Sequence, residues 1–320
     1  MKGFGSAKLT CEFADRAVIA HSRFPTQDMQ TLDTTSKDWC GLEWSEWVPF
    51  DGGRFDSLTK GPGVYRVRIP GQPFLAYIGQ SGRDVRSRLQ SLRTNAASEL
   101  MPYDDPHTAA PSLWAWRDAR GYTYECSGAP ASPDKRERLA LESWLLWNHR
   151  LAYGRSTLCN HGHFHLHYLK SANRKSGRRG GLKIEIADFA LDIQPSLPPL
   201  LLCAAPTDSN WMGLTWSDWA ALQDRHHPSN PGLYRLRSQG SNDLLYIGET
   251  NSLASRLRTH EKKSTSLEQL EVSYSIQPMT ISKCGLHELE NDLIAGYYDV
   301  RKTLPSLQFF TAPSTVAESV

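Results

Sequence analysis

Two tyrosines, an arginine and a glutamate occur in each half of the chain, and their side-chain types are suited to phosphoryl transfer. In the second half they are Tyr234, Tyr246, Arg256 and Glu290. Hydrolysis of a phosphodiester needs a proton acceptor for the attacking water, a cation that offsets the developing charge, and a carboxylate that holds a metal ion. The phenols, the guanidinium and the carboxylate can supply all three.

The first half carries the same set in the same order. Its members are Tyr65, Tyr77, Arg88 and Glu142, and Arg86 is an alternative to Arg88 because this half has one extra residue before its arginine. The spacing between the two tyrosines is the same in both halves. A single strand tyrosine or a single helix glutamate is more often structural than catalytic. The recurrence of the whole set therefore favours a functional role.

Local patterns predict the elements that position these residues. Residues 63–69 alternate as a strand does, and residues 74–79 follow a turn, which indicates a β-hairpin that carries the tyrosines. Asp84 and Ser252 can cap the helices that carry the arginines. Each glutamate lies on a later helix beside leucines, where a carboxylate is costly unless it is paired or binds a cation. Each repeat is therefore expected to be a small α+β sandwich, a hairpin-based sheet flanked by helices.

Four short motifs recur in one order along the chain, and such repeats indicate tandem units of one fold. The matching segments are 39–47 with 211–219, 61–68 with 230–237, 75–89 with 244–257, and 138–146 with 286–294. We therefore predict one domain at 37–183 and a second at 208–312. The remaining segments are an unplaced N-terminal stretch at 1–36, a proline-rich, extended linker at 184–207, and a tail at 313–320.

The paired motifs resemble the GIY-YIG nuclease superfamily, which includes homing endonucleases, some restriction enzymes and a nucleotide-excision-repair nuclease. The residues that carry the resemblance are GVY at 63–65 with YIG at 77–79, and GLY at 232–234 with YIG at 246–248. The resemblance implies that the tyrosines bind or deprotonate the attacking water and that the arginine contacts the scissile phosphate. It also implies that Glu142 and Glu290 each ligate one divalent ion, Mg²⁺ or Mn²⁺.

The resemblance is incomplete in each half. His260 lies one helical turn after Arg256, at a position that the family fills with His or Tyr, whereas the first half has Leu92 there. A distant histidine, His107 or His149, is a candidate substitute. The family often has a later asparagine, which is present as Asn160, but the second half has Gln308 at the same distance from its glutamate.

Nucleic-acid contacts are predicted locally, because the formal net charge of +2 does not by itself indicate a nucleic-acid partner. Residues 170–183 contain six basic and no acidic residues among glycines and serines, which suits a flexible arm on a phosphate backbone. The predicted contacts are Arg86, Arg174, Lys175, Arg178 and Arg179. Duplex DNA is the expected substrate.

Three further segments have less specific patterns. The tryptophan motifs at 39–47 and 211–219 are expected to cover one side of each sheet, with base stacking as the alternative. Residues 94–134 form an insertion that could shape a groove. The histidines of the run HGHFHLHY would share one face of a strand, where they could bind zinc or nickel, and these are His161, His163, His165 and His167.

The sequence therefore predicts a metal-dependent DNA endonuclease with two active sites, which could cut both strands without dimerisation. A restriction or defence enzyme fits this arrangement, and a repair or mobile-element nuclease is equally compatible with the chemistry. The alternative is a nucleic-acid-binding protein in which one or both nuclease folds have decayed. The scattered cysteines and the lack of a signal peptide or a membrane-spanning stretch favour the cytoplasm. The oligomeric state is left open.

Overall fold

The computed structural model describes residues 33–103, 109–171, 179–182, 193–223, 226–263 and 269–310. We call residues 33–182 the first half, residues 193–204 the connection and residues 205–310 the second half. The N-terminal segment up to residue 32, the tail, His107 and the predicted contacts Arg174, Lys175 and Arg178 lie outside the described residues. None of the helices in the described ranges combines the length and apolar content needed to cross a membrane.

The two halves have sheets with the same strand order. The first sheet has the order β1-β4-β2-β3, and the second has the order β7-β10-β8-β9. The strands of the first half are β1 (Val48–Pro49), β2 (Gly63–Arg68), β3 (Leu75–Ser81) and β4 (Glu125–Pro130). Those of the second half are β7 (Ala220–Ala221), β8 (Gly232–Ser238), β9 (Leu244–Thr250) and β10 (Leu270–Ile276). The predicted antiparallel hairpins are confirmed as β2-β3 and β8-β9.

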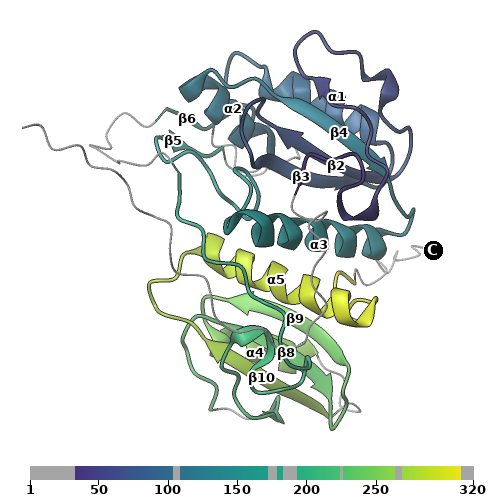
Figure 1. Ribbon diagram of the computed structural model, residues 1–320. Helices are drawn as coiled ribbons and strands as arrows, with labels where there is room; N and C mark the ends of the chain where they lie inside the picture. The colour runs from purple at the N-terminus through teal and green to yellow at the C-terminus, as the bar shows by residue number, and fades with distance from the viewer. Residues whose placement is uncertain are drawn as a thin grey trace, which may run out of the picture.

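Helices cover both faces of each sheet. In the first half α1 (Val85–Ala96) packs on one face and α3 (Lys135–Tyr153) on the other, and in the second half α4 (Leu253–Lys263) and α5 (Lys283–Arg301) do the same. Figure 1 shows α3 and α5 side by side in the centre of the molecule, between the two sheets. The α+β architecture follows, with the two glutamate-bearing helices packed on each other.

The predicted helix caps are confirmed in both halves. The Asp84 side chain accepts a hydrogen bond from the backbone N–H of Ser87 at 2.5 Å, and Ser252 accepts one from Ser255 at 3.4 Å. Satisfying these N-terminal N–H groups fixes where α1 and α4 begin. Because each arginine lies close to its cap, the cap also fixes how far the arginine is from the hairpin.

The prediction of an insertion at 94–134 is partly wrong. Residues 125–130 form β4, which lies between β1 and β2, and β10 takes the same place in the second sheet. The extra material of the first half is the stretch 97–124, which contains α2 (Ala109–Arg120). The sequence ECSGAP did not indicate a strand, because glycine and proline have low strand propensity. The pairing of β4 with β2 is also not local in the sequence.

Each tryptophan motif encloses a buried arginine from the middle of the sheet, so the prediction that these motifs cover one side of each sheet is confirmed. The Arg66 guanidinium lies 4.2 Å from the ring centre of Trp44, and that of Arg235 lies 4.3 Å from Trp216. Arg66 also donates to the carbonyl of Thr34 at 2.5 Å, and Arg235 donates to that of Pro206 at 2.5 Å. The carbonyl oxygens and the indole faces stabilise the positive charge of each guanidinium and so offset the cost of removing it from water.

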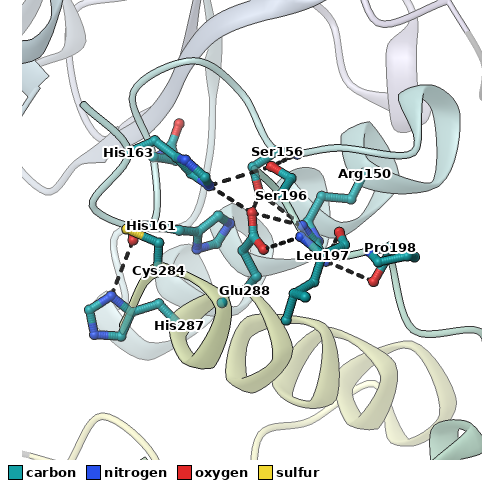
Figure 2. Close-up of polar contacts among 12 residues, drawn as sticks. Arg150, Ser156, His161, His163, Ser196, Leu197, Pro198, Cys284, His287 and Glu288 are labelled. Carbon is teal, nitrogen blue, oxygen red and sulfur yellow. Dashed lines mark hydrogen bonds and ion pairs between the residues drawn. The ribbon is translucent and has the colours of Figure 1, made fainter. Parts of the chain in front are cut away.

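A buried ionic network holds the two halves together. Arg150 of α3 donates to Asp292 of α5 at 2.9 Å and lies 3.2 Å from Glu288, and all three side chains are 0% exposed. Figure 2 shows Glu288 surrounded by partners from several segments, including the hydroxyl of Ser156 at 2.6 Å and Nε2 of His163 at 2.7 Å. Burial raises the pKa of Glu288, but these partners outweigh burial and hold it at about 2.

The connection between the halves belongs to the same network. Its residues form no helix or strand. The backbone N–H of Leu197 donates to Glu288 at 2.8 Å, that of Leu200 donates to Asp292 at 2.9 Å, and the Leu200 carbonyl accepts from the Trp147 indole at 2.9 Å. This part of the linker is therefore anchored along the seam between α3 and α5.

Candidate active site

In each half the hairpin brings the two predicted tyrosines together. The ring centres of Tyr65 and Tyr77 are 6.1 Å apart, and those of Tyr234 and Tyr246 are 5.9 Å apart. Tyr65 lies opposite Gly79 across the strand pair, and a Cβ added to this glycine would lie 2.7 Å from the Tyr65 phenol oxygen. The glycine of the YIG motif is therefore needed for space beside the phenol.

The predicted arginines contact the first tyrosine of each pair. Arg256 Nε donates to the Tyr234 hydroxyl at 2.9 Å, and Arg88 Nε donates to the Tyr65 hydroxyl at 3.1 Å. Arg86 is directed elsewhere, because its guanidinium donates to the carbonyl of Leu58 at 3.1 Å. The geometry therefore favours Arg88 over Arg86 as the counterpart of Arg256.

The second half adds a histidine to its tyrosine pair. His260 Nε2 lies 2.9 Å from the Tyr234 hydroxyl, and its ring centre lies 5.3 Å from that of Tyr246. Arg256 donates to the Tyr234 oxygen, so the phenol hydrogen is left to point at His260 Nε2. The equivalent Leu92 is fully buried in the core of the first half.

His149 does not replace the missing histidine of the first half. Its ring is fully buried, and Nε2 accepts a hydrogen bond from the backbone N–H of Leu75 at 3.1 Å. Burial lowers its pKa to about 3, so the ring stays neutral and is committed to the backbone of β3. The other candidate, His107, lies outside the described residues.

The two predicted glutamates line one pocket between the halves. This pocket has a volume of about 440 Å³. The residues used below that line it are Tyr77, Glu142, Asn160, Lys170, His287 and Glu290. Next to the glutamates, Asn291 Nδ2 of α5 donates to the carbonyl of Ser143 of α3 at 3.1 Å, so the two helices touch where they carry the acids. Of the predicted site residues, Tyr77, Glu142, Asn160 and Glu290 thus face a common space.

The environment of these glutamates differs from that of a structural carboxylate. Burial raises the pKa of Glu142 to about 7, because the nearby positive charge of Arg88 compensates only part of the desolvation. Burial and the neighbouring Glu249 raise the pKa of Glu290 to about 8. Glu288, two residues away, has a lowered pKa because it is fully paired. Perturbed carboxylates in a pocket are typical of functional sites.

The two glutamates fit the requirements of a hard divalent cation. Magnesium commonly uses one or two carboxylates and completes its coordination with water and substrate phosphates. Glu142 has no hydrogen bond or ion pair to another described residue, and both glutamates are half-buried at the pocket. Within the described ranges, no cluster of three or more His, Cys, Asp or Glu side chains is placed to hold a metal.

The strand predicted for the histidine run is wrong. Residues 161–167 form turns and coil, and His161 has a φ of 53°. His163 pairs with Glu288, whereas the His165 ring packs at 4.5 Å from that of Trp116. The alternation was misleading because the contacts of this segment, with α5 and with α2, are not local. The run therefore packs the two halves together.

Asn160 and Gln308 play the same part in the two halves. Asn160 Oδ1 accepts from the backbone N–H of Ile78 at 2.9 Å, and its Nδ2 donates to the Ile78 carbonyl at 2.8 Å. Gln308 Oε1 accepts from the N–H of Ile247 at 3.0 Å. Ile78 and Ile247 are the central residues of the two YIG motifs, on strands at the edge of each sheet. These side-chain amides therefore form hydrogen bonds with the backbone of the edge strand beside the second tyrosine.

Of the nucleic-acid contacts predicted within the basic segment 170–183, only Arg179 is among the described residues. Arg179 lies with its guanidinium 5.0 Å from the ring centre of Tyr103, next to the short hairpin of β5 (Tyr168–Leu169) and β6 (Gly181–Leu182). Lys170, which follows β5, lines the pocket with the two glutamates. The basic segment therefore begins at the edge of this pocket, which the sequence did not predict.

Sequence reasoning also missed polar neighbours of Glu290. Glu249 follows the second YIG motif. It forms an ion pair with Lys283, and its Oε1 lies 3.6 Å from His287 Nε2. In the first half the corresponding Gln80 accepts a hydrogen bond from Arg138 at 3.1 Å. Glu249 and Gln80 occupy matching positions of the repeat. The difference in charge between them is the sequence signal that could have indicated a polar neighbour of Glu290.

Comparison with known proteins identifies one part of the chain. The family model described as the GIY-YIG catalytic domain matches residues 230–297. This range begins just before β8 and includes Tyr234, Tyr246, Arg256 and Glu290. No curated protein and no solved structure matches the chain.

Proposed function

We propose that this chain hydrolyses phosphodiester bonds in DNA with a divalent metal ion, because residues 230–297 match the model of the GIY-YIG catalytic domain, which indicates an endonuclease. The observation that carries the proposal is the clustering of two phenols, a guanidinium and a half-buried carboxylate in the second half. Tyr234 stacks on Tyr246 and accepts a hydrogen bond from Arg256, and the charge of Glu290 acts on Tyr234. The same clustering in the first half supports a second GIY-YIG site there. The two domains would be centred on the two sheets, with the connection along their seam.

The second half contains a complete route for a proton. Tyr234 is deeply buried, which raises the pKa of its hydroxyl, so it is a neutral phenol. Its oxygen can accept a proton from the attacking water while its own proton passes to His260 Nε2, 2.9 Å away. Arg256 is held in place by Tyr234, with its positive charge available to the phosphate. The geometry thus permits Tyr234 to take a proton from water, His260 to take the proton of Tyr234, and Arg256 to offset the charge of the phosphate.

Glu290 and Glu142 would hold the metal ion, and Mg²⁺ or Mn²⁺ suits these oxygen ligands. When bound, such an ion polarises the phosphate and stabilises the charge of the leaving oxygen. Their raised pKa values, about 8 and about 7, reflect burial that a cation would compensate. The positions of the two carboxylates beside the tyrosine pairs support this assignment.

The common pocket supports cutting of two strands by one chain. Glu142 and Glu290 lie on helices that contact each other next to both acids. A duplex bound across this seam would present two backbones to two sites without dimerisation of the protein. Restriction or defence is the role that such paired cutting favours, although repair or mobile-element chemistry would use the same residues.

A plasmid assay tests the proposal. Supercoiled duplex DNA is incubated with Mg²⁺ or Mn²⁺ and wild type, Glu142→Ala, Glu290→Ala or the double variant. We expect wild type to linearise the plasmid, each single variant to nick it, and the double variant to lose at least about 100-fold in rate, since the metal supplies several kcal/mol. Glu271→Gln is the matched control, because this carboxylate pairs with Arg237 away from the pocket.

Two outcomes would overturn the proposal. Cleavage undiminished in the double variant would show that the glutamates are not metal ligands. Wild type that binds DNA but cuts neither duplex nor single-stranded DNA would establish a non-catalytic binding protein.

A second candidate is a half-active enzyme in which the first half mainly binds DNA. The observation that favours it is Leu92, which takes the place of His260, so that among the described residues no histidine occupies that position beside Tyr65. Under this alternative Glu290→Ala is inactive, whereas Glu142→Ala gives the wild-type products. The same plasmid assay therefore distinguishes the two.

A further inference from the structure

Glu249 differs from the other carboxylates of the second sheet because it lies next to Glu290. It is near the end of β9, and its side chain is only 10% exposed. The charge of Glu249 raises the pKa of Glu290, whereas the backbone N–H of Glu249 lowers it. Lys283 and His287, which contact Glu249, lie on the same helix as Glu290. Two acidic side chains from different elements, β9 and α5, therefore lie near each other, and Glu290 lines the pocket.

The two carboxylate oxygens of Glu249 are not equivalent. Oε1 is taken by Lys283, with His287 Nε2 at 3.6 Å, and the Lys283 side chain is 48% exposed. Oε2 is buried and has no hydrogen-bond partner among the residues that the structure describes. A buried, unpaired carboxylate oxygen is costly. This oxygen is therefore suited to accept a cation.

The first half lacks this second acid. Gln80 occupies the matching place on β3, and its Oε1 accepts from Arg138 Nε at 3.1 Å. The first half therefore has a neutral amide next to an arginine where the second half has a carboxylate. The repeat provides an internal control, since the tyrosine, arginine and glutamate positions are otherwise shared.

We propose that Glu249 is a second carboxylate ligand for the divalent cation held by Glu290, so that the second half has a two-carboxylate site and the first half a one-carboxylate site. This inference rests on the proposed function. Hard cations such as Mg²⁺ and Mn²⁺ prefer oxygen ligands, and their affinity increases with the number of charged ligands. The second half then binds the cation more tightly than the first.

The test measures Mn²⁺ binding by electron paramagnetic resonance, without DNA and in a Glu142→Ala background, where only the second half binds. Glu249→Gln is expected to weaken binding by at least about tenfold. Lys283→Met is expected to tighten binding about two- to fivefold, because it removes a partly exposed positive charge near the site. Glu271→Gln controls for the loss of one carboxylate from the same sheet.

A purely structural role for Glu249 predicts a different pattern. If Glu249 serves only as the ion-pair partner of Lys283, the variants Glu249→Gln and Lys283→Met both lower the melting temperature measured without metal. Neither variant then changes the affinity for Mn²⁺. That result would overturn the inference. Opposite shifts in affinity, with each variant still folded by its melting curve, would support it.

The inference and the proposed function can fail separately. If DNA is cut by wild type but Glu249→Gln binds Mn²⁺ normally, the second ligand is wrong and the nuclease assignment stands. If Mn²⁺ binding depends on Glu249 and Glu290 but no DNA is cut, the site is a cation site without the proposed activity.

Discussion

The two halves of this chain share a framework but differ in the chemistry next to it. Both have the same strand order, an arginine within hydrogen-bond distance of the first tyrosine, and an amide that clamps the YIG strand. They differ where a group could take a proton or hold a cation, at His260 against Leu92 and at Glu249 against Gln80. The packing positions of the repeat are thus alike, whereas its polar positions beside the candidate tyrosines and glutamates have diverged.

The largest effect is expected from the arginines. Arg256→Ala in a Glu142→Ala background, and Arg88→Ala in a Glu290→Ala background, should each lower the nicking rate about 10²- to 10³-fold, because each removes the cation facing the phosphate. Single-turnover nicking of a plasmid measures this. Arg86→Ala is the control, since Arg86 is held by the carbonyl of Leu58. A loss with Arg86→Ala and none with Arg88→Ala would reverse the assignment in the first half.

The histidine tests whether the halves differ in proton transfer. His260→Leu makes the second half resemble the first at this position, and we expect its nicking rate to fall about 100-fold, as for loss of a general base. His260→Gln should lose as much, because an amide can hydrogen-bond to Tyr234 but cannot take its proton. Full activity in the glutamine variant would mean that the hydrogen bond alone is sufficient, and the proposed relay would be wrong.

The smallest effect concerns pH. A protonated carboxyl cannot ligate a cation, so affinity falls as pH drops below the pKa of the free ligand, by about tenfold per unit. Burial and Glu249 raise the pKa of Glu290 to about 8, whereas burial raises that of Glu142 to about 7. Mn²⁺ affinity of the second half should therefore keep rising to a higher pH than that of the first. Titrations of the two single-glutamate variants between pH 6 and 9 measure this, and identical profiles would contradict it.

Local features of the fold could be predicted because their causes are local. Asp84 and Ser252 cap helices through their own neighbours, and the hairpins form between adjacent segments. The histidine run and the strand β4 could not be predicted in the same way. Their contacts, with Glu288 and with β2, come from distant parts of the chain.

The candidate site shows the same division. Spacing within the repeat gave both tyrosines, the arginine and the glutamate of each half. It favoured Arg88 but left Arg86 as an alternative, because one inserted residue makes both positions plausible on a helix. The direction of the side chains supports Arg88, which donates to Tyr65, whereas Arg86 donates to the carbonyl of Leu58.

The sequence alone determined the repeat, the residue types at each position and the α+β class, because periodicity and motif order are properties of the chain itself. Tertiary structure decided that α3 and α5 pack together, so that Glu142 and Glu290 line one pocket, and that Glu249 lies next to Glu290 while Glu288 is fully paired. The reason is physical: a carboxylate has the same residue type everywhere, and its role depends on the charges, donors and solvent that folding places around it.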